Sequence, residues 1–421
     1  MVKFVLPRPT ACFLMLISVA AQAAPARQMP PGAPLTLAAA QAKVMQHNAA
    51  LRALAHEVSA QDGMVRQAGA MPNPELSALV EDRHSATRST TIQLTQPVEL
   101  GGKRGARVNA AEAERELARA TLAAMRSDLR ANTSTAFYNV LAAQAKLDLT
   151  DATVALATQG LSAAATTVAA GKNSPVDETR ARIAMSGAEI ELAQARGDTD
   201  HAREALASLW GGSGEELGQV EGNLSNLPES ASLPVLLARL ERAPGVARAR
   251  LELQRRVALG RVESARRMPD LAITVGSKND EQFGRRQAVF GVSLPLPLFD
   301  RNQGRVDETA QRIEQARAEL AAASASLASA LRSAHRRLTV ACSQANSLET
   351  GHIPAARSVY EATRKGYEYG KFGILDVFEV QRVLLQAQAQ HVRVLADAYS
   401  AAADIERILG APGTVQLQET P

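Results

Sequence analysis

Few residues in this sequence have the type and spacing that chemistry requires. The run 101–105, Gly-Gly-Lys-Arg-Gly, contains the glycines and the lysine that a phosphate-binding loop uses. It lacks the G-x-x-x-x-G-K-S/T spacing with which such a loop wraps backbone N–H groups around a phosphate. We therefore interpret the run as a flexible turn between a strand and a helix.

The histidines form no pattern typical of metal ligands. Protein zinc sites use His and Cys pairs at short, fixed spacings. Here His47 and His56 lie nine residues apart, on different helix turns, and we expect both to be surface or packing residues. No H-x-x-x-H pair occurs among the seven histidines: 47, 56, 84, 201, 335, 352 and 391. The sequence predicts no metal site, no cofactor and no enzyme activity.

Two carboxylates have a more suggestive spacing. Asp376 and Glu379 lie three residues apart at the start of a predicted helix, so their side chains share one face. Such a pair can attract cations. It can also be an ordinary pair of acids that the helix dipole favours at an N-terminus, and both interpretations stay open.

The composition predicts long helices rather than a conventional globular core. The chain has 421 residues, of which 46% are hydrophobic but only 3% aromatic, whereas a core of this size normally contains many aromatic side chains. Ala, Leu, Arg, Glu and Gln dominate, as in closely packed long helices. Because 47 Lys and Arg are interspersed with 43 Asp and Glu, nucleic-acid binding is not predicted.

The N-terminus predicts export. Lys3 and Arg8 precede an apolar stretch, 11–21, and Ala21-Gln22-Ala23 is typical of a signal-peptidase site, so residues 1–23 are expected to be removed. A buried N-terminal helix is the alternative. Cleavage leaves Cys342 as the one cysteine and excludes an internal disulfide. After residue 23 there is no apolar run of about 18 residues, so no membrane-spanning helix is predicted.

The rest of the chain contains an internal duplication. Met71-Pro72 recurs as Met268-Pro269, Gln96-Pro97 as Leu294-Pro295, and Gly171-Lys172 as Gly370-Lys371, always at an offset of about 200 residues. This predicts a first repeat (24–211), a linker (212–233), a second repeat (234–410) and a short tail (411–421).

Each repeat has the same predicted plan of helix, β-hairpin, long helix and helix. The hairpins are expected at about 74–97 and 269–296, where apolar and polar residues alternate with period two. Their polar connections are expected at 82–88 and 277–286. Heptad ladders of Leu, Val and Ala predict long helices over 102–170 and 302–369.

The helix lengths define the architecture. One long helix measures about 100 Å at 1.5 Å per residue, and the first and last helices of each repeat (36–70 with 175–210, and 234–267 with 375–409) stacked end to end have the same length. We expect a kink at Pro244-Gly245. A long antiparallel cylinder follows, with both hairpins at one end.

The four strands cannot form a membrane structure alone. Segments of about ten residues with one apolar face have the length for crossing a bilayer at a tilt, but closed membrane barrels need at least about eight strands. The chain is therefore predicted to be an oligomer.

The duplicated helix–hairpin–helix–helix plan and the run 96–104, Gln-Pro-Val-Glu-Leu-Gly-Gly-Lys-Arg, carry a family resemblance. The plan resembles that of the TolC family of outer-membrane efflux channels, and the run is similar to the heavy-metal (cobalt–zinc–cadmium) resistance branch of that family. The runs 294–301 and 366–378 resemble its second strand-to-helix junction and second hairpin tip. The resemblance covers about residues 35 to 411.

The resemblance implies a homotrimer in the outer membrane of a Gram-negative bacterium. Three chains would form a 12-stranded β-barrel in the lipid bilayer and a long periplasmic tunnel of α-helices. The trimer would be the passive exit duct of a tripartite pump, beside a periplasmic adaptor and an inner-membrane RND transporter, with divalent heavy-metal cations as cargo. A duct for drug efflux or type I protein secretion, and a soluble periplasmic coiled-coil adaptor or scaffold, are the alternatives.

The resemblance also assigns site residues. Adaptor hairpins would dock at the tips, at Gly171, Lys172, Gly370 and Lys371. Three further residues match the periplasmic aperture: Asp376, Glu379 and the aromatic Tyr367. This chain departs from the family at the second tip, where Phe372 stands in place of a frequent arginine and Lys371 comes one position earlier, so the family's closing ion pairs are not expected in the same form here.

Overall fold

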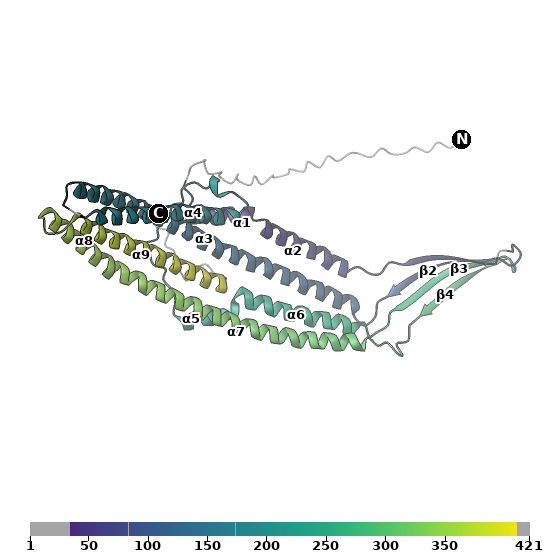
Figure 1. Ribbon diagram of the computed structural model, residues 1–421. Helices are drawn as coiled ribbons and strands as arrows, with labels where there is room; N and C mark the ends of the chain where they lie inside the picture. Colours follow the sequence, from purple (N-terminus) through teal and green to yellow (C-terminus); the bar gives the residue numbers. More distant parts are fainter. Residues whose placement is uncertain (1–33, 83, 173, 411–421) are drawn as a thin grey trace, which may run out of the picture.

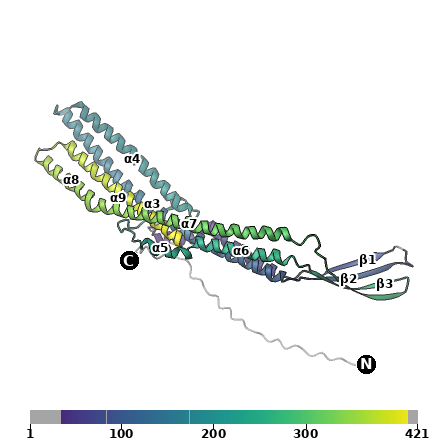
Figure 2. The same cartoon turned by 90° about the horizontal axis from the view of Figure 1, so that it is seen from below.

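The chain is elongated, with a β-sheet at one end and helical hairpin tips at the other (Figures 1 and 2). The computed structural model describes residues 34–82, 84–172 and 174–410. The predicted signal peptide, 1–23, and the tail, 411–421, lie outside these residues. No helix in the described ranges is both long and apolar enough to cross a membrane.

The first repeat begins with a helix that is divided in two. Asn48 ends α1 and begins α2, where its side chain accepts a hydrogen bond from the Leu51 N–H (2.9 Å) and donates one to the Leu209 carbonyl (2.8 Å). The sequence predicted one unbroken helix here. The bond partner Leu209 is 161 residues away, so no local pattern reveals the break at Asn48. The elements of the repeat are α1 Leu37–His47, α2 Ala49–Ala68, β1 Glu75–Glu81, β2 Ser89–Val98, α3 Lys103–Ala169 and α4 Pro175–Ser208.

The linker leads into a second repeat with the same order of elements. A short 3-10 helix, η1 Gly214–Glu216, lies in the linker, and Leu35 forms a parallel bridge with Val220. As predicted, the next helix breaks immediately before Pro244. The elements are α5 Leu233–Arg239, η2 Leu240–Arg242, α6 Pro244–Ala265, β3 Leu271–Asp280, β4 Arg285–Ser293, α7 Gln303–Ser347, the π-helix η3 Leu348–His352, α8 Ile353–Glu368 and α9 Ile374–Leu409.

The second long helix is interrupted where the sequence predicted continuity. Equivalent residues of the two repeats lie 198 positions apart before the π-helix (Leu129 and Leu327) and 199 apart after it (Gly171 and Gly370). A π-turn accommodates one residue more than an α-turn, so η3 absorbs this insertion. Pro354 lies just after η3; it lacks an N–H and its ring excludes the carbonyl four residues earlier, which favours the wider turn.

The four strands form one antiparallel sheet in the order β1-β2-β3-β4. One row of paired residues across it is apolar and exposed, Leu76, Leu94, Val275 and Phe290. The adjacent row, on the opposite face, is Glu75, Thr95, Thr274 and Gly291. The sheet therefore has one apolar and one polar face. The second hairpin loop is shorter than predicted, because pairing continues to Asp280 and Arg285.

Each repeat has its own apolar core in the helical part. Val44, Phe137 and Leu206 are fully buried in the first, and Leu331 and Ile405 in the second. Many of the other buried positions are alanines, whose small side chains let helices lie close together. The helix α3 packs against α4 of its own repeat and against α9 of the other, so the two repeats form one body.

Candidate functional site

Both hairpin tips reverse the chain with the same backbone turn. Gly171 and Gly370 have φ values of +68° and +70°, which glycine adopts without the steric cost that a Cβ brings. Each glycine donates its N–H to the carbonyl three residues earlier (2.9 and 2.8 Å). The backbone N–H groups of the next residues, Lys172 and Lys371, donate to the carbonyl five residues earlier (2.9 and 2.8 Å). The two predicted tips are thus equivalent in shape and lie at the same end of the molecule (Figure 1).

Asp376 caps the N-terminus of α9. Its Oδ2 accepts a hydrogen bond from the Gly373 N–H (2.9 Å), and its own N–H donates to the Gly373 carbonyl (3.1 Å). At the first tip Ser174 caps α4 instead, accepting from the Val176 N–H (3.3 Å). The Asp376 side chain therefore stabilises the helix start while it stays exposed at the tip.

Glu379 is paired with an arginine that the sequence interpretation missed. Arg382, one helix turn later, donates from Nε and from a terminal nitrogen to the two carboxylate oxygens, with an Nε–Oε2 distance of 3.1 Å. This hydrogen bonding holds the pKa of the Glu379 carboxyl below its ordinary value. The i,i+3 spacing is the signal that could have revealed the pair. Asp376 and Glu379 are thus not equivalent charges.

The second tip carries exposed aromatic side chains. Tyr367, Tyr369 and Phe372 are 44%, 80% and 48% exposed. The Phe372 ring lies on Gly366, where an added Cβ would come within 2.3 Å of it. The predicted aperture role of Tyr367 stays a prediction, as does adaptor docking at the two tips. At the first tip the residues at the corresponding positions, 199 earlier, are Val168, Ala170 and Asn173, so the two tips share a backbone shape but the first has no aromatic side chain at these positions.

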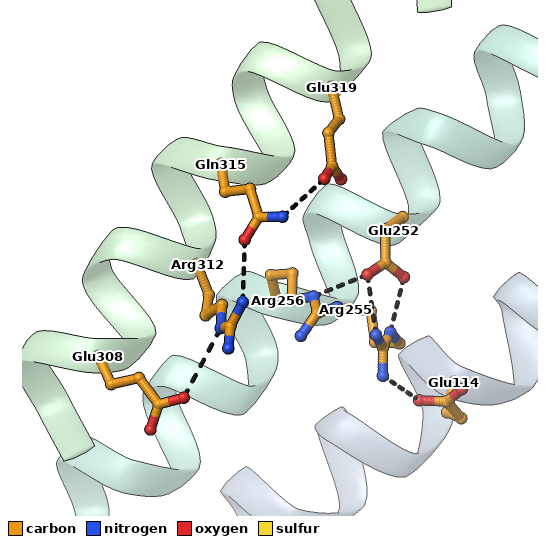
Figure 3. Close-up of polar contacts among 8 residues, drawn as sticks. All are labelled: Glu114, Glu252, Arg255, Arg256, Glu308, Arg312, Gln315 and Glu319. Carbon is orange, nitrogen blue, oxygen red and sulfur yellow. Dashed lines mark hydrogen bonds and ion pairs between the residues drawn. The ribbon is translucent and has the colours of Figure 1, made fainter.

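Charged side chains form ion pairs on three neighbouring helices, α3, α6 and α7 (Figure 3). Arg255 on α6 bonds Glu252 of its own helix (2.7 Å) and Glu114 of α3 (3.0 Å). These hydrogen bonds raise the pKa of Arg255 and, in return, hold the pKa of Glu252 below its ordinary value. On α7, Arg312 contacts Glu308 at 3.6 Å. The contact of Arg255 with Glu114 ties α6 to α3, whereas the other ion pairs lie three or four residues apart within one helix.

The junctions between strands and helices differ between the repeats. After β2, the Lys103 Nζ contacts the Asp270 Oδ1 at 2.7 Å, and Arg107 pairs with Glu99. After β4, Leu296, Leu298 and Phe299 are exposed instead. Gly102 and Lys103 of the phosphate-loop-like run begin α3, as the sequence predicted for a strand-to-helix turn.

Within the described residues, no group of three or more His, Cys, Asp or Glu side chains is arranged to hold a metal ion. The chemically distinctive surfaces are instead the two hairpin tips and the two-faced sheet, at opposite ends of about 100 Å of helix. This arrangement can join an apolar layer at one end to a partner surface at the other.

Comparison with known proteins identifies this arrangement. The chain is 44% identical, over 90% of its own length and 90% of the relative's, to the cobalt-zinc-cadmium resistance protein CzcC of Cupriavidus metallidurans. Its fold is similar to that of a membrane protein from Pseudomonas aeruginosa (TM-score 0.76, 20% identity, 89% of this chain and 90% of the other). It is also similar to the Campylobacter jejuni CmeC outer membrane channel (TM-score 0.75, 15% identity, 89% and 85%).

The family comparison agrees in both repeats. The model of the outer membrane efflux proteins matches residues 41–212 and 236–411, which together include nearly all the helices and strands described above. The duplicated helix–hairpin–helix–helix plan predicted from the sequence is the plan of the structure. The chain belongs to the outer membrane efflux protein family.

Proposed function

We propose that three copies of this chain form a passive exit duct for divalent heavy-metal cations of the cobalt, zinc and cadmium type. The duct would work with a periplasmic adaptor and an inner-membrane RND transporter. The observation that carries the metal assignment is the 44% identity to a cobalt-zinc-cadmium resistance protein over 90% of both chains.

The sheet supports the membrane part of the proposal. Its apolar face suits lipid, and its polar face presents side chains such as Thr91, Gln93, Thr95 and Thr274. Three sheets of four strands would close into a 12-stranded barrel with the polar face inside. Hydroxyl and amide groups can solvate a passing hydrated cation without holding it tightly.

The tips support the periplasmic part of the proposal. They lie at the far end from the sheet (Figure 1), which is where an adaptor would meet the duct. Glu379 and Asp376 would lie near the threefold axis, where carboxylates raise the local concentration of cations. Because Arg382 neutralises Glu379 in each chain, the net charge there is smaller than the carboxylates alone would give.

A growth experiment tests the cargo. Deleting the gene is expected to sensitise cells to zinc, cobalt or cadmium more than to dyes and detergents, and the wild-type gene should restore resistance. The reverse ranking would contradict the metal assignment while leaving the duct intact. Fractionation tests the duct: we expect an outer-membrane protein that runs as a trimer when unboiled. Monomeric protein in the periplasmic extract would contradict it.

A further inference from the structure

The two edges of the sheet are complementary. We infer that Phe299 and the end of β4 in one copy of the chain pack against Met71 and the start of β1 in a second copy, in a register set by the internal duplication. The inference rests on the proposed threefold duct and adds which residues meet and how the strands align.

The contact between the two repeats of one chain supplies the template. There β2 pairs with β3, Thr95 stands opposite Thr274, and the two hydroxyls are 3.1 Å apart. Beyond the strands, Gly101 lies against Met268: a Cβ built on Gly101 would be 2.8 Å from the Met268 Cβ. The loop after one strand is thus covered by the residues that precede the next.

The equivalent surfaces at the sheet edges are uncovered. The duplication relates β2 to β4 at an offset of 198 (Pro97 to Pro295) and β3 to β1 at an offset of 197 (Met268 to Met71). These offsets place Phe299 at the position of Gly101 and Met71 at that of Met268. Phe299 is 91% exposed and Met71 is 71% exposed. Both side chains are apolar and uncovered in the single chain, so each can cover the other between two chains.

The same offsets fix the strand register. The pair Thr95–Thr274 becomes Ser293 opposite Ser77, which again joins two hydroxyls. On the apolar face the offsets bring together side chains that are all exposed in the single chain: Phe290 opposite Val80, and Leu294 opposite Leu76. The pairs expected between chains are thus of the same kind as those within one chain: hydroxyl opposite hydroxyl on the polar face and apolar opposite apolar on the other.

Other registers lose one of these matches. A shift by one residue would turn the apolar residues of one strand onto the polar face of its partner. A shift by two keeps the faces but places Ser293 opposite Glu75 or Leu79, and it moves Phe299 about 7 Å along the strand direction, away from Met71. Only the register with Ser293 opposite Ser77 satisfies both the strand pairing and the contact of Phe299 with Met71.

Cysteine cross-linking in the full-length protein tests the register. In a Cys342→Ser background, the double variant S77C/S293C should form an intermolecular disulfide on mild oxidation, because facing residues bring their Cβ atoms within disulfide range. The matched controls E75C/S293C and L79C/S293C should cross-link at least about tenfold less, since their Cβ atoms lie about 7 Å or more apart. Each single cysteine variant should give no cross-linked dimer.

A second pair outside the strands guards against misfolded strand variants. M71C/F299C should be joined between chains by a short bis-maleimide, whereas M64C/F299C, which moves the first cysteine seven residues back onto α2, should not. A normal unboiled trimer in which a control pair links better than S77C/S293C, or in which M71C/F299C stays unlinked, would overturn the inference and leave the proposed duct standing. Absence of any trimer for the unmodified chain would overturn both.

Discussion

Tyr138 of α3 and Tyr399 of α9 stack with their ring centroids 3.8 Å apart and an interplanar angle of 13°. The Tyr399 hydroxyl continues from this stack into the linker, where it donates to the carbonyls of Asn226 and Asn223, the latter at 3.4 Å. One side chain therefore joins the first repeat, the second repeat and the segment between them.

Substitutions at Tyr399 should separate the contribution of the ring stack from that of the hydroxyl hydrogen bonds. Tyr399→Phe keeps the stack and loses the hydroxyl, and we expect a cost of about 1 kcal/mol. Tyr399→Ala also leaves a cavity between α3 and α9, at a cost of about 3–5 kcal/mol. Thermal unfolding in detergent measures both, with the exposed Tyr369→Ala as a control that should change little. Equal effects of the two Tyr399 variants would contradict the importance of the stack.

The charge state of the second tip should depend on Arg382. Arg382→Gln removes the partner of Glu379, so the reconstituted channel should become more cation-selective, by about twofold in permeability ratio. Glu379→Gln leaves Arg382 unpaired and should have the opposite effect. Reversal potentials across a salt gradient measure both, and shifts of the same sign in the two variants would be inconsistent with the pair.

The Glu379 pair also has a defined pH dependence. Because the folded-state pKa of Glu379 is lowered, the pair contributes fully above the ordinary Glu pKa of 4.5 and is lost only as the pH falls through the folded-state value. Wild-type selectivity should therefore stay constant from pH 8 to about 5. In Arg382→Gln the carboxylate should titrate at a higher pH than in the wild type.

Glu406 should lower stability at neutral pH. Burial in α9 raises its pKa to about 6, so the folded chain binds this proton more tightly than the unfolded chain does. The resulting penalty is absent well below pH 4.5, grows as the pH rises from 4.5 to about 6, and is fully present above that. Glu406→Gln should thus stabilise the protein at pH 7.5, by up to about 2 kcal/mol, and have little effect near pH 4.

Unfolding midpoints at the two pH values check this. The matched control is Asp404, two residues earlier on the same helix and paired with Arg337 at 2.7 Å, so Asp404→Asn should not stabilise at either pH. A stabilisation by Glu406→Gln of equal size at pH 4 and 7.5 would rule out burial of the charge as its cause.

Two helical glycines should respond oppositely to substitution. Gly187 on α4 has open space around it, so Gly187→Ala should stabilise the helix by about 1 kcal/mol. Gly160 on α3 is buried, and a Cβ there would lie 3.1 Å from the Phe378 ring. Gly160→Leu should destabilise by about 1–3 kcal/mol through overpacking. Thermal unfolding decides this, and a harmless Gly160→Leu would mean that α3 and α9 are not closely packed here.

The repeated fold could be predicted because its signals are local and periodic. Alternation with period two placed the strands, heptads placed the long helices, and glycine with lysine marked both tips. The division at Asn48 and the contact of Lys103 with Asp270 depend on residues 161 and 167 positions away. No local pattern contains such contacts, so the sequence could not predict them.

The candidate site was predictable in part. The tip positions followed from the duplication, whereas the pairing of Glu379 with Arg382 and the capping by Asp376 needed side-chain geometry. The i,i+3 spacing of Glu379 and Arg382 was present in the sequence, but it fits many surface pairs equally well. Only the structure distinguishes a carboxylate that bonds backbone from one that bonds a guanidinium.

The π-helix Leu348–His352 has a consequence for how such a chain can change in length. A one-residue insertion in an uninterrupted α-helix rotates everything beyond it by about 100° and advances it by 1.5 Å. Here the wide turn takes up the additional residue locally, and the heptad side of α8 still meets α9. Two repeats that differ in length by one residue can therefore end at the same level along the molecule, with the same glycine turn.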